Sequence, residues 1–148
     1  MDYQQELVHT FAPDMKEIGQ RDWDEVQHNA KTSELNPDIE SYILLEERDQ
    51  LYIFTCRDKG VLAGYFTAFV IPDLHSKGNM RVVNDAIFLD KPYRKGFTGI
   101  RLIKFAEKCI KSDGYPVLSI STTEQNPIDP LMVRLGYYKV STTFEKEL

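Results

Sequence analysis

The stretch Leu89-Asp-Lys-Pro-Tyr-Arg-Lys-Gly-Phe-Thr-Gly99 connects a predicted β-strand to the start of a predicted helix. The first backbone amides of a helix have no partner within the helix, and the helix dipole adds positive potential at the same end. Glycine lets an anion approach the main chain closely. The stretch contains neither the Walker A pattern nor the Gly-x-Gly-x-x-Gly dinucleotide pattern. We therefore expect an anion-binding loop of another type.

Positive charge gathers around this loop. The 148-residue chain has a net charge of −5, but residues 1–74 carry 15 acidic and 6 basic side chains, whereas residues 75–148 carry 8 acidic and 12 basic ones. The basic residues around Gly96 and Gly99 can neutralise a small polyanion, or they can form the solvated face of a helix. An acidic chain without a basic tail makes nucleic acid an unlikely main partner. Five of the basic residues fall within fourteen positions: Lys91, Arg94, Lys95, Arg101 and Lys104.

The rest of the chain alternates between extended and helical patterns. Residues 51–57 and 61–71 are rich in aromatic and β-branched side chains and are joined by Asp58, Lys59 and Gly60, which predicts an antiparallel hairpin. Residues 81–89 extend this hairpin, and a strand–helix–strand unit further on requires a parallel pair. We expect an α/β (α+β) fold, a mixed and mostly antiparallel sheet flanked by helices. The other predicted elements are a strand at 3–10, for which a helix is the alternative, helices at 12–27, from 36 onward, at 100–113 and at 127–135, and strands at 115–121 and 137–144.

Length and composition point to one domain that spans residues 1–148. A chain of this length, 42% apolar, buries about 70% of its unfolded surface when it folds. It contains no run of about 20 apolar residues, and Asp2 with Glu6 argues against a basic secretory leader, so we expect a cytoplasmic protein. Cys56 and Cys109 lack partners at metal-ligand spacing, which predicts packing roles and no metal site.

At the loop, the sequence resembles the pyrophosphate-binding motif of the GNAT superfamily of N-acetyltransferases: Arg or Gln, two residues, Gly, one residue, then Gly or Ala. Arg94 and Gly99 match this pattern, whereas Phe97 holds the first glycine position and Gly96 stands one place earlier. Leu131-Met-Val-Arg-Leu-Gly-Tyr137 resembles the closing helix and Leu-Gly-Phe turn of the family. The resemblance covers about residues 51–148 and a plausible first strand and helix. Trp23-Asp-Glu25, the Gly64-Tyr65 strand, the turn at residues 72–75 and Tyr93-Arg-Lys-Gly together look like the short acetyltransferase-like proteins of tailed bacteriophages.

This resemblance implies a cleft for acetyl-CoA where the strand that ends at Leu89 splays from the strand at 117–121. The resemblance implies that main-chain groups of Ile87 and Leu89 hold the pantetheine arm, and that amides of residues 94–99 hold the pyrophosphate. Basic side chains here, Arg94, Lys95 or Lys104, would neutralise the phosphate charge. Asn126 is a further implied contact, although a helix cap before Pro127 explains it equally well. The implied cofactor-binding residues are Ile87, Phe88, Leu89, Arg94, Lys95, Gly96, Phe97, Thr98, Gly99 and Asn126.

The resemblance also implies attack by an amine on the thioester, which needs a proton acceptor for the ammonium and a donor for the departing thiolate. We expect Asp85, as a buried carboxylate with raised pKa, to accept the proton, with Glu25 and then Asp24 as alternatives. A structural pairing of Asp85 with Arg81 or a backbone group is the competing interpretation. Many family members use a tyrosine as the acid where this chain has Met132, so Tyr138 is the candidate here. His75, on a polar loop, is a possible proton relay or a plain solvated residue.

The function implied is an acetyl-CoA-dependent N-acetyltransferase that modifies a primary amine of a small molecule or a protein. The alternative is a catalytically weak or inactive interaction protein with the same fold, such as a phage virion component or an inhibitor of a host protein; Phe97 and Met132 favour this alternative. The acidic first half of the chain suggests a cationic acceptor, although surface acidity kept for solubility explains the same charges. We expect a monomer or homodimer that binds no membrane.

Overall fold

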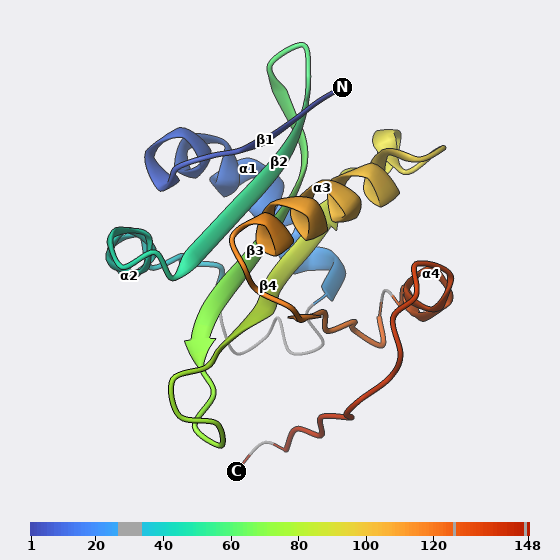
Figure 1. Ribbon diagram of the computed structural model, residues 1–148. Helices are drawn as coiled ribbons and strands as arrows, with labels where there is room; N and C mark the ends of the chain where they lie inside the picture. The colour runs from blue at the N-terminus through green and yellow to red at the C-terminus, as the bar shows by residue number, and fades with distance from the viewer. Residues whose placement is uncertain (27–33, 126, 147) are drawn as a thin grey trace.

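The computed structural model describes residues 1–26, 34–125, 127–146 and 148 (Figure 1). A sheet forms the centre of the fold, with helices on both of its faces. The elements in chain order are β1 (Asp2–Gln5), α1 (Val8–Val26), α2 (Ile39–Glu47), β2 (Leu51–Asp58), β3 (Val61–Pro72), β4 (Met80–Leu89), the 3-10 turn η1 (Lys91–Tyr93), α3 (Thr98–Ser112), β5 (Leu118–Ser119) and α4 (Asp129–Arg134).

The hairpin of β2 and β3 is the framework of the sheet. Leu51 pairs with Phe69 at the open end, and Asp58 pairs with Val61 at the turn. Lys59 and Gly60 have φ values of 51° and 87°, the positive values that a tight two-residue turn between right-twisted strands requires. The hairpin predicted from the sequence is confirmed.

The sheet has the strand order β1-β2-β3-β4-β5. The first three pairings are antiparallel, and β4 pairs with β5 in parallel, as the strand–helix–strand connection through α3 requires. The predicted fold class, a mixed and mostly antiparallel sheet flanked by helices, is confirmed.

Two hydrophobic layers hold the helices against opposite faces of the sheet. α3 presents Leu102, Ala106 and Ile110 to one face, where Phe54 and Phe66 are fully buried. α1 and α2 pack on the other face in a second cluster that includes Phe11, Ile18, Ile53, Leu62, Tyr65 and Phe88. Figure 1 shows α3 in front of the sheet and α1 behind it.

A β-bulge interrupts β4 at the middle of the strand. Thr67 pairs with Ala86 and Ala68 pairs with Asn84, so Asp85 is an extra residue without a partner in β3. A bulge shifts the alternation of side chains by one position. Strict alternation along residues 81–89 predicts that Val83, Asp85 and Ile87 share one face, and this prediction is wrong. Val83 pairs with Phe69 and Ile87 pairs with Phe66, so the two side chains lie on opposite faces of the sheet.

Both ends of the chain differ from the predicted elements. β1 stops at Gln5 because α1 already begins at Val8, whose amide donates to the Glu46 carboxylate of α2 at 2.7 Å. The predicted strand at 3–10 is thus too long, and the predicted start of the first helix is late. The strand predicted at 137–144 is absent from the described chain, because no neighbouring strand supplies the ladder hydrogen bonds that a strand needs. β5, with two paired residues, is also shorter than predicted.

Candidate acetyl-CoA cleft and acceptor site

The parallel strands β4 and β5 diverge soon after they meet. Their pairing consists of Val82 with Leu118 and Val83 with Ser119. One residue further along, the two strands are joined by a side chain, because the Ser121 amide donates to Asn84 Oδ1 at 2.5 Å. Beyond Asn84, no β5 residue in the described chain pairs with β4, so the second half of β4 has an open edge.

The backbone alternation of β4 determines which groups face this edge. The Asp90 amide donates to the Ala63 carbonyl of β3 at 2.9 Å. Groups two residues apart point the same way in an antiparallel ladder, so Phe88 also faces β3, whereas Ile87 and Leu89 face the open edge. The Leu89 carbonyl is taken by Arg94 Nε at 2.7 Å. The open edge therefore offers the main chain of Ile87 and the Leu89 amide to a ligand.

The loop after β4 leads directly into the amino end of α3. Asp90 accepts a hydrogen bond from the Lys91 amide and starts the η1 turn, and Gly96 adopts a φ of +83° that favours glycine. Phe97 occupies the N-cap position of α3 and gives no side-chain cap hydrogen bond. The first amides of α3 thus lack a capping side chain, which suits an anion.

Basic side chains differ in their availability around this loop. Lys95, Arg101 and Lys104 are exposed, and none of them takes part in an ion pair within the part of the chain that the structure describes. Arg94, in contrast, pairs with Glu25 Oε2 at 2.6 Å and lies 5.3 Å from the centre of the Phe88 ring. The uncapped amides, the exposed cations and the open edge of β4 together fit a pantetheine arm with a pyrophosphate.

Asp85 lies on the face of the sheet that α1 and α2 cover. Its Oδ2 accepts hydrogen bonds from Tyr42 Oη at 3.0 Å and from Thr67 Oγ1 at 3.1 Å. The expected burial is wrong, because the bulge carries Asp85 out of the ladder and leaves it exposed. Within the described residues, neither the expected Arg81 nor a backbone group is the partner of Asp85; its partners are two side-chain hydroxyls. Asp85 is two residues from Ile87, so a carboxylate lies close to the open edge of β4.

The buried carboxylate near this site is Asp22 of α1, which was not predicted from the sequence. Asp22 is 9% exposed and accepts a hydrogen bond from Tyr65 Oη at 2.5 Å. Burial raises the pKa of Asp22; the hydrogen bond from Tyr65 opposes the rise, and the nearby charges of Glu25 and Asp85 add to it. Asp22 follows Phe11, Met15 and Ile18 at helical spacing, so the apolar stripe of α1 was the signal that would have identified it.

Glu25 lies at the C-terminal end of α1, and its carboxylate is engaged with the loop between β4 and α3. It contacts Arg94 at 2.6 Å and Lys91 Nζ at 3.5 Å. Asp24 is exposed and accepts a hydrogen bond from Gln20. Of the three carboxylates expected to take the proton, Asp85 is the one that lies on β4 itself, two residues before Ile87 at the open edge.

Two further predicted site residues, His75 and Tyr138, lie outside the cleft. His75 lies in the turn between β3 and β4. Asp85 lies about five residues, or ~16 Å, beyond the first residue of β4, so His75 is at least that far along the strand from Asp85. Tyr138 follows α4 and is 82% exposed, while its neighbour Tyr137 donates to Glu107 of α3 at 2.7 Å. Met132, at the family's tyrosine position, is buried. Asn126 lies outside the described residues.

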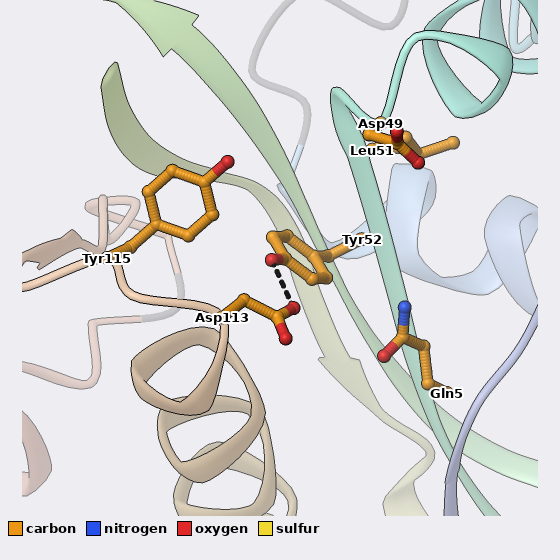
Figure 2. Close-up of a pocket in the computed structure, with 6 residues that line it drawn as sticks. All are labelled: Gln5, Asp49, Leu51, Tyr52, Asp113 and Tyr115. Carbon is orange, nitrogen blue, oxygen red and sulfur yellow. Dashed lines mark hydrogen bonds between the residues drawn. The ribbon is translucent and has the colours of Figure 1, made fainter. Parts of the chain in front are cut away.

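A separate hollow of about 280 Å³ lies at the other end of α3, away from the loop (Figure 2). Figure 2 shows the Tyr52 hydroxyl turned toward the Asp113 carboxylate, to which it donates at 2.6 Å. Its lining residues are Gln5, Asp49, Leu51, Tyr52, Asp113 and Tyr115. None of the residues assigned to the cleft contributes to it.

The described residues also bear on metal and membrane binding. Among them, no three His, Cys, Asp or Glu side chains gather in an arrangement that could hold a metal ion. In the same residues, no helix is long and apolar enough to cross a membrane. Cys56 and Cys109 carry free thiols, and burial raises the pKa of the Cys56 thiol to about 11, which fits a packing role.

Several solved structures with the same architecture are acetyltransferases. No protein-family model and no curated protein sequence matches the chain. A GCN5-related N-acetyltransferase from Ralstonia eutropha JMP134 has a TM-score of 0.79 at 14% identity, covering 99% of this chain and 97% of that one. An aminoglycoside acetyltransferase from an uncultured soil metagenomic sample, in complex with sisomicin, has a TM-score of 0.76 at 12% identity, with 99% and 95% covered. A ribosomal-protein-alanine N-acetyltransferase from Brucella melitensis biovar Abortus 2308 has a TM-score of 0.65 at 15% identity, with both chains fully covered.

At these identities the similarity establishes the fold. The chain has the fold of the GCN5-related N-acetyltransferases, which the GNAT-like motif predicted. The more specific resemblance to bacteriophage proteins stays a prediction.

Proposed function

We propose that the protein is an N-acetyltransferase that transfers an acetyl group from acetyl-CoA to a primary amine. One observation carries this proposal: the open edge of β4 leads into an uncapped helix start, and the carboxylates of Asp85 and Asp22 lie near the same edge. The fold shared with GCN5-related N-acetyltransferases supports it.

In this proposal the main chain of Ile87 and the amide of Leu89 hold the pantetheine arm. The amides of residues 96–99 hold the pyrophosphate, where the dipole of α3 favours negative charge. Lys95 and Lys104, both exposed and without an acidic partner in the described chain, supply the counter-charge.

Asp85 is the proposed proton acceptor. It takes one proton from the incoming ammonium group, and the free amine nitrogen then bonds to the thioester carbon. The carbon–sulfur bond breaks, the nitrogen loses its second proton as the amide forms, and the departing CoA thiolate takes up that proton. Tyr42 and Thr67 orient the Asp85 carboxylate through their hydroxyl groups. Because both hydroxyls donate to Oδ2, and Oδ1 accepts no hydrogen bond within the described residues, Oδ1 is the oxygen that we expect to receive the amine proton.

A cationic amine is the proposed acceptor. Asp22 and Asp85 form no ion pair among the described residues, and the charge of the nearby Arg94 offsets that of Asp22 only in part. The proposed acceptor side therefore carries net negative charge. Such charge raises the local concentration of a protonated amine. Polyamines, aminosugars and lysine or amino-terminal groups of proteins share this chemistry, and the aminoglycoside acetyltransferase with the same fold was solved with an aminosugar, sisomicin.

The test is release of CoA thiol from acetyl-CoA in the presence of a panel of amines. We expect release with at least one polyamine, aminosugar or peptide amine, and loss of that release in Asp85→Asn. Thermal unfolding supplies the binding control, because CoA at 100 times its dissociation constant adds about 2.7 kcal/mol of stability.

A non-catalytic interaction protein is the second candidate, favoured by Phe97, whose ring is 67% exposed at the start of α3 where the family has glycine. Stabilisation by CoA without thiol release from any amine of the panel would favour this candidate. No stabilisation by CoA would remove the acetyltransferase assignment.

A further inference from the structure

The loop between β4 and α3 is tied to the last two turns of α1 by charged side chains of both signs. Glu25 contacts Arg94 at 2.6 Å and Lys91 at 3.5 Å, and Arg21 contacts Asp90 at 3.4 Å. We call these five residues the clasp. The clasp joins segments about 70 positions apart, and each of its two α1 residues meets loop residues of opposite charge.

Arg94 has little freedom to leave the clasp. Its Nε donates to the Leu89 carbonyl at 2.7 Å, its Nη2 donates to Glu25, and its guanidinium lies 5.3 Å from the Phe88 ring centre. The side chain is therefore bound to α1 and to the end of β4. The family motif implies, in contrast, that this arginine neutralises phosphate.

We propose that Glu25 is a positioning residue for CoA binding, which acts through Arg94 by holding the loop 90–97 in the conformation that presents the amides of α3. Arg94 serves the cofactor as part of this clasp and not as a phosphate ligand. Glu25 holds Arg94 from α1, so that α1 and the cofactor loop are held as one unit. This inference rests on the proposed function, since it assigns a role in CoA binding.

The direction in which a single substitution changes the CoA affinity separates the positioning role of Glu25 from simple electrostatics. Glu25→Gln removes a negative charge near a site for a polyanion. If charge alone mattered, or if the substitution released Arg94 to bind phosphate, CoA would bind more tightly. If the clasp positions the loop, CoA binds more weakly, because the loop must then be ordered during binding.

The first experiment is calorimetric titration of CoA into the wild-type protein, Glu25→Gln and Asp24→Asn. Asp24 is the matched control, because it neighbours Glu25 on α1, is exposed and takes no part in the clasp. We expect Glu25→Gln to weaken CoA binding about three- to tenfold, the loss typical of one partly exposed, hydrogen-bonded ion pair. Asp24→Asn should leave the affinity unchanged or raise it slightly. Unchanged or tighter binding in Glu25→Gln would overturn the proposal.

A double-mutant cycle tests the route through Arg94. In the Arg94→Gln background, Glu25→Gln should bring little further loss of CoA affinity, because the contact is already gone. Additive losses would overturn the claim that Glu25 acts through Arg94. Thermal unfolding of each variant verifies that the fold is kept, as expected for side chains at a helix end.

Hydrogen exchange without any ligand keeps this proposal separate from the proposed function. In Glu25→Gln, amides of residues 90–99 should exchange faster than in the wild type, while those of the β2–β3 hairpin keep their rates. Unchanged exchange in residues 90–99 would overturn the clasp even if CoA binds. If the wild type binds no CoA, the proposed function and the role in CoA binding both fall, whereas the exchange result still decides whether the clasp orders the loop.

Discussion

Gly64 of β3 is the position where one added carbon should disturb both the fold and the cleft. A Cβ at this residue would lie 2.6 Å from the Phe88 carbonyl oxygen, 2.8 Å from Leu89 Cδ1 and 3.1 Å from Leu89 Cα. Ordinary contacts of a Cβ begin at 3.4 Å, so β4 must move by about 0.8 Å to relieve the contact with the carbonyl oxygen. That oxygen belongs to the backbone and cannot turn aside as a flexible side chain would.

We expect Gly64→Ala to destabilise the protein by about 1–3 kcal/mol, the usual cost of overpacking a well-packed site. In a domain of this size, a loss of that order lowers the melting temperature by roughly 3–10 °C. Because the displaced segment forms the open edge of β4, CoA should also bind more weakly. Urea unfolding measures the first effect, and calorimetric titration of CoA measures the second.

Gly99→Ala is the matched control for stability, because its Cβ would meet the same leucine, Leu89 Cδ2, at an ordinary 3.5 Å. It should unfold within about 0.5 kcal/mol of the wild type or be slightly more stable, since alanine is the better helix former. If Gly64→Ala matched this control in stability and bound CoA as the wild type does, the close approach of β3 and β4 would not govern the cleft.

Three further predictions concern the acceptor side. Burial raises the pKa of Asp22, so the ionised carboxylate destabilises the fold at pH values above the unfolded pKa near 3.8. Asp22→Asn, whose side-chain oxygen still accepts the hydrogen bond from Tyr65, should therefore be more stable than the wild type at pH 7. In urea unfolding, this gain in stability should be absent near pH 4. Lower stability of Asp22→Asn at pH 7 would contradict this reasoning. Asp85→Asn should keep CoA affinity and reduce kcat at neutral pH by about 10²–10⁴-fold; wild-type turnover with any active amine would remove Asp85 from the mechanism. For a cationic acceptor, kcat/KM should fall as salt rises, because screening shortens to about 8 Å at physiological ionic strength; a flat profile would refute electrostatic attraction.

Local patterns were sufficient to predict the elements that carry the fold. The hairpin of β2 and β3 follows from its aromatic and β-branched residues and from a turn with glycine, and α3 follows from apolar residues at helical spacing. The strand at 137–144 was predicted from the same kind of alternation and is wrong. A strand is stable only beside a partner, and the pattern of one segment does not say whether a partner exists.

The candidate site depends on features that no local pattern contains. The bulge at Asp85 is a mismatch between two strands, so it follows from pairing and not from the alternation within β4 alone. Glu25 and Arg94 are 69 positions apart in the sequence and were predicted as separate site residues, but they form an ion pair with each other. Asp22 is different, since its place on the apolar stripe of α1 was visible in the sequence.

The measurement that most directly tests the central claim is titration of the ¹⁵N-labelled protein with CoA, followed through its amide NMR signals. Binding at the proposed cleft should shift the amides of Ile87, Leu89 and residues 96–99 most strongly. The amides around the hollow lined by Tyr52 and Asp113 should stay in place. An unchanged spectrum at millimolar CoA, or shifts confined to another part of the chain, would contradict the assignment of this cleft to acetyl-CoA.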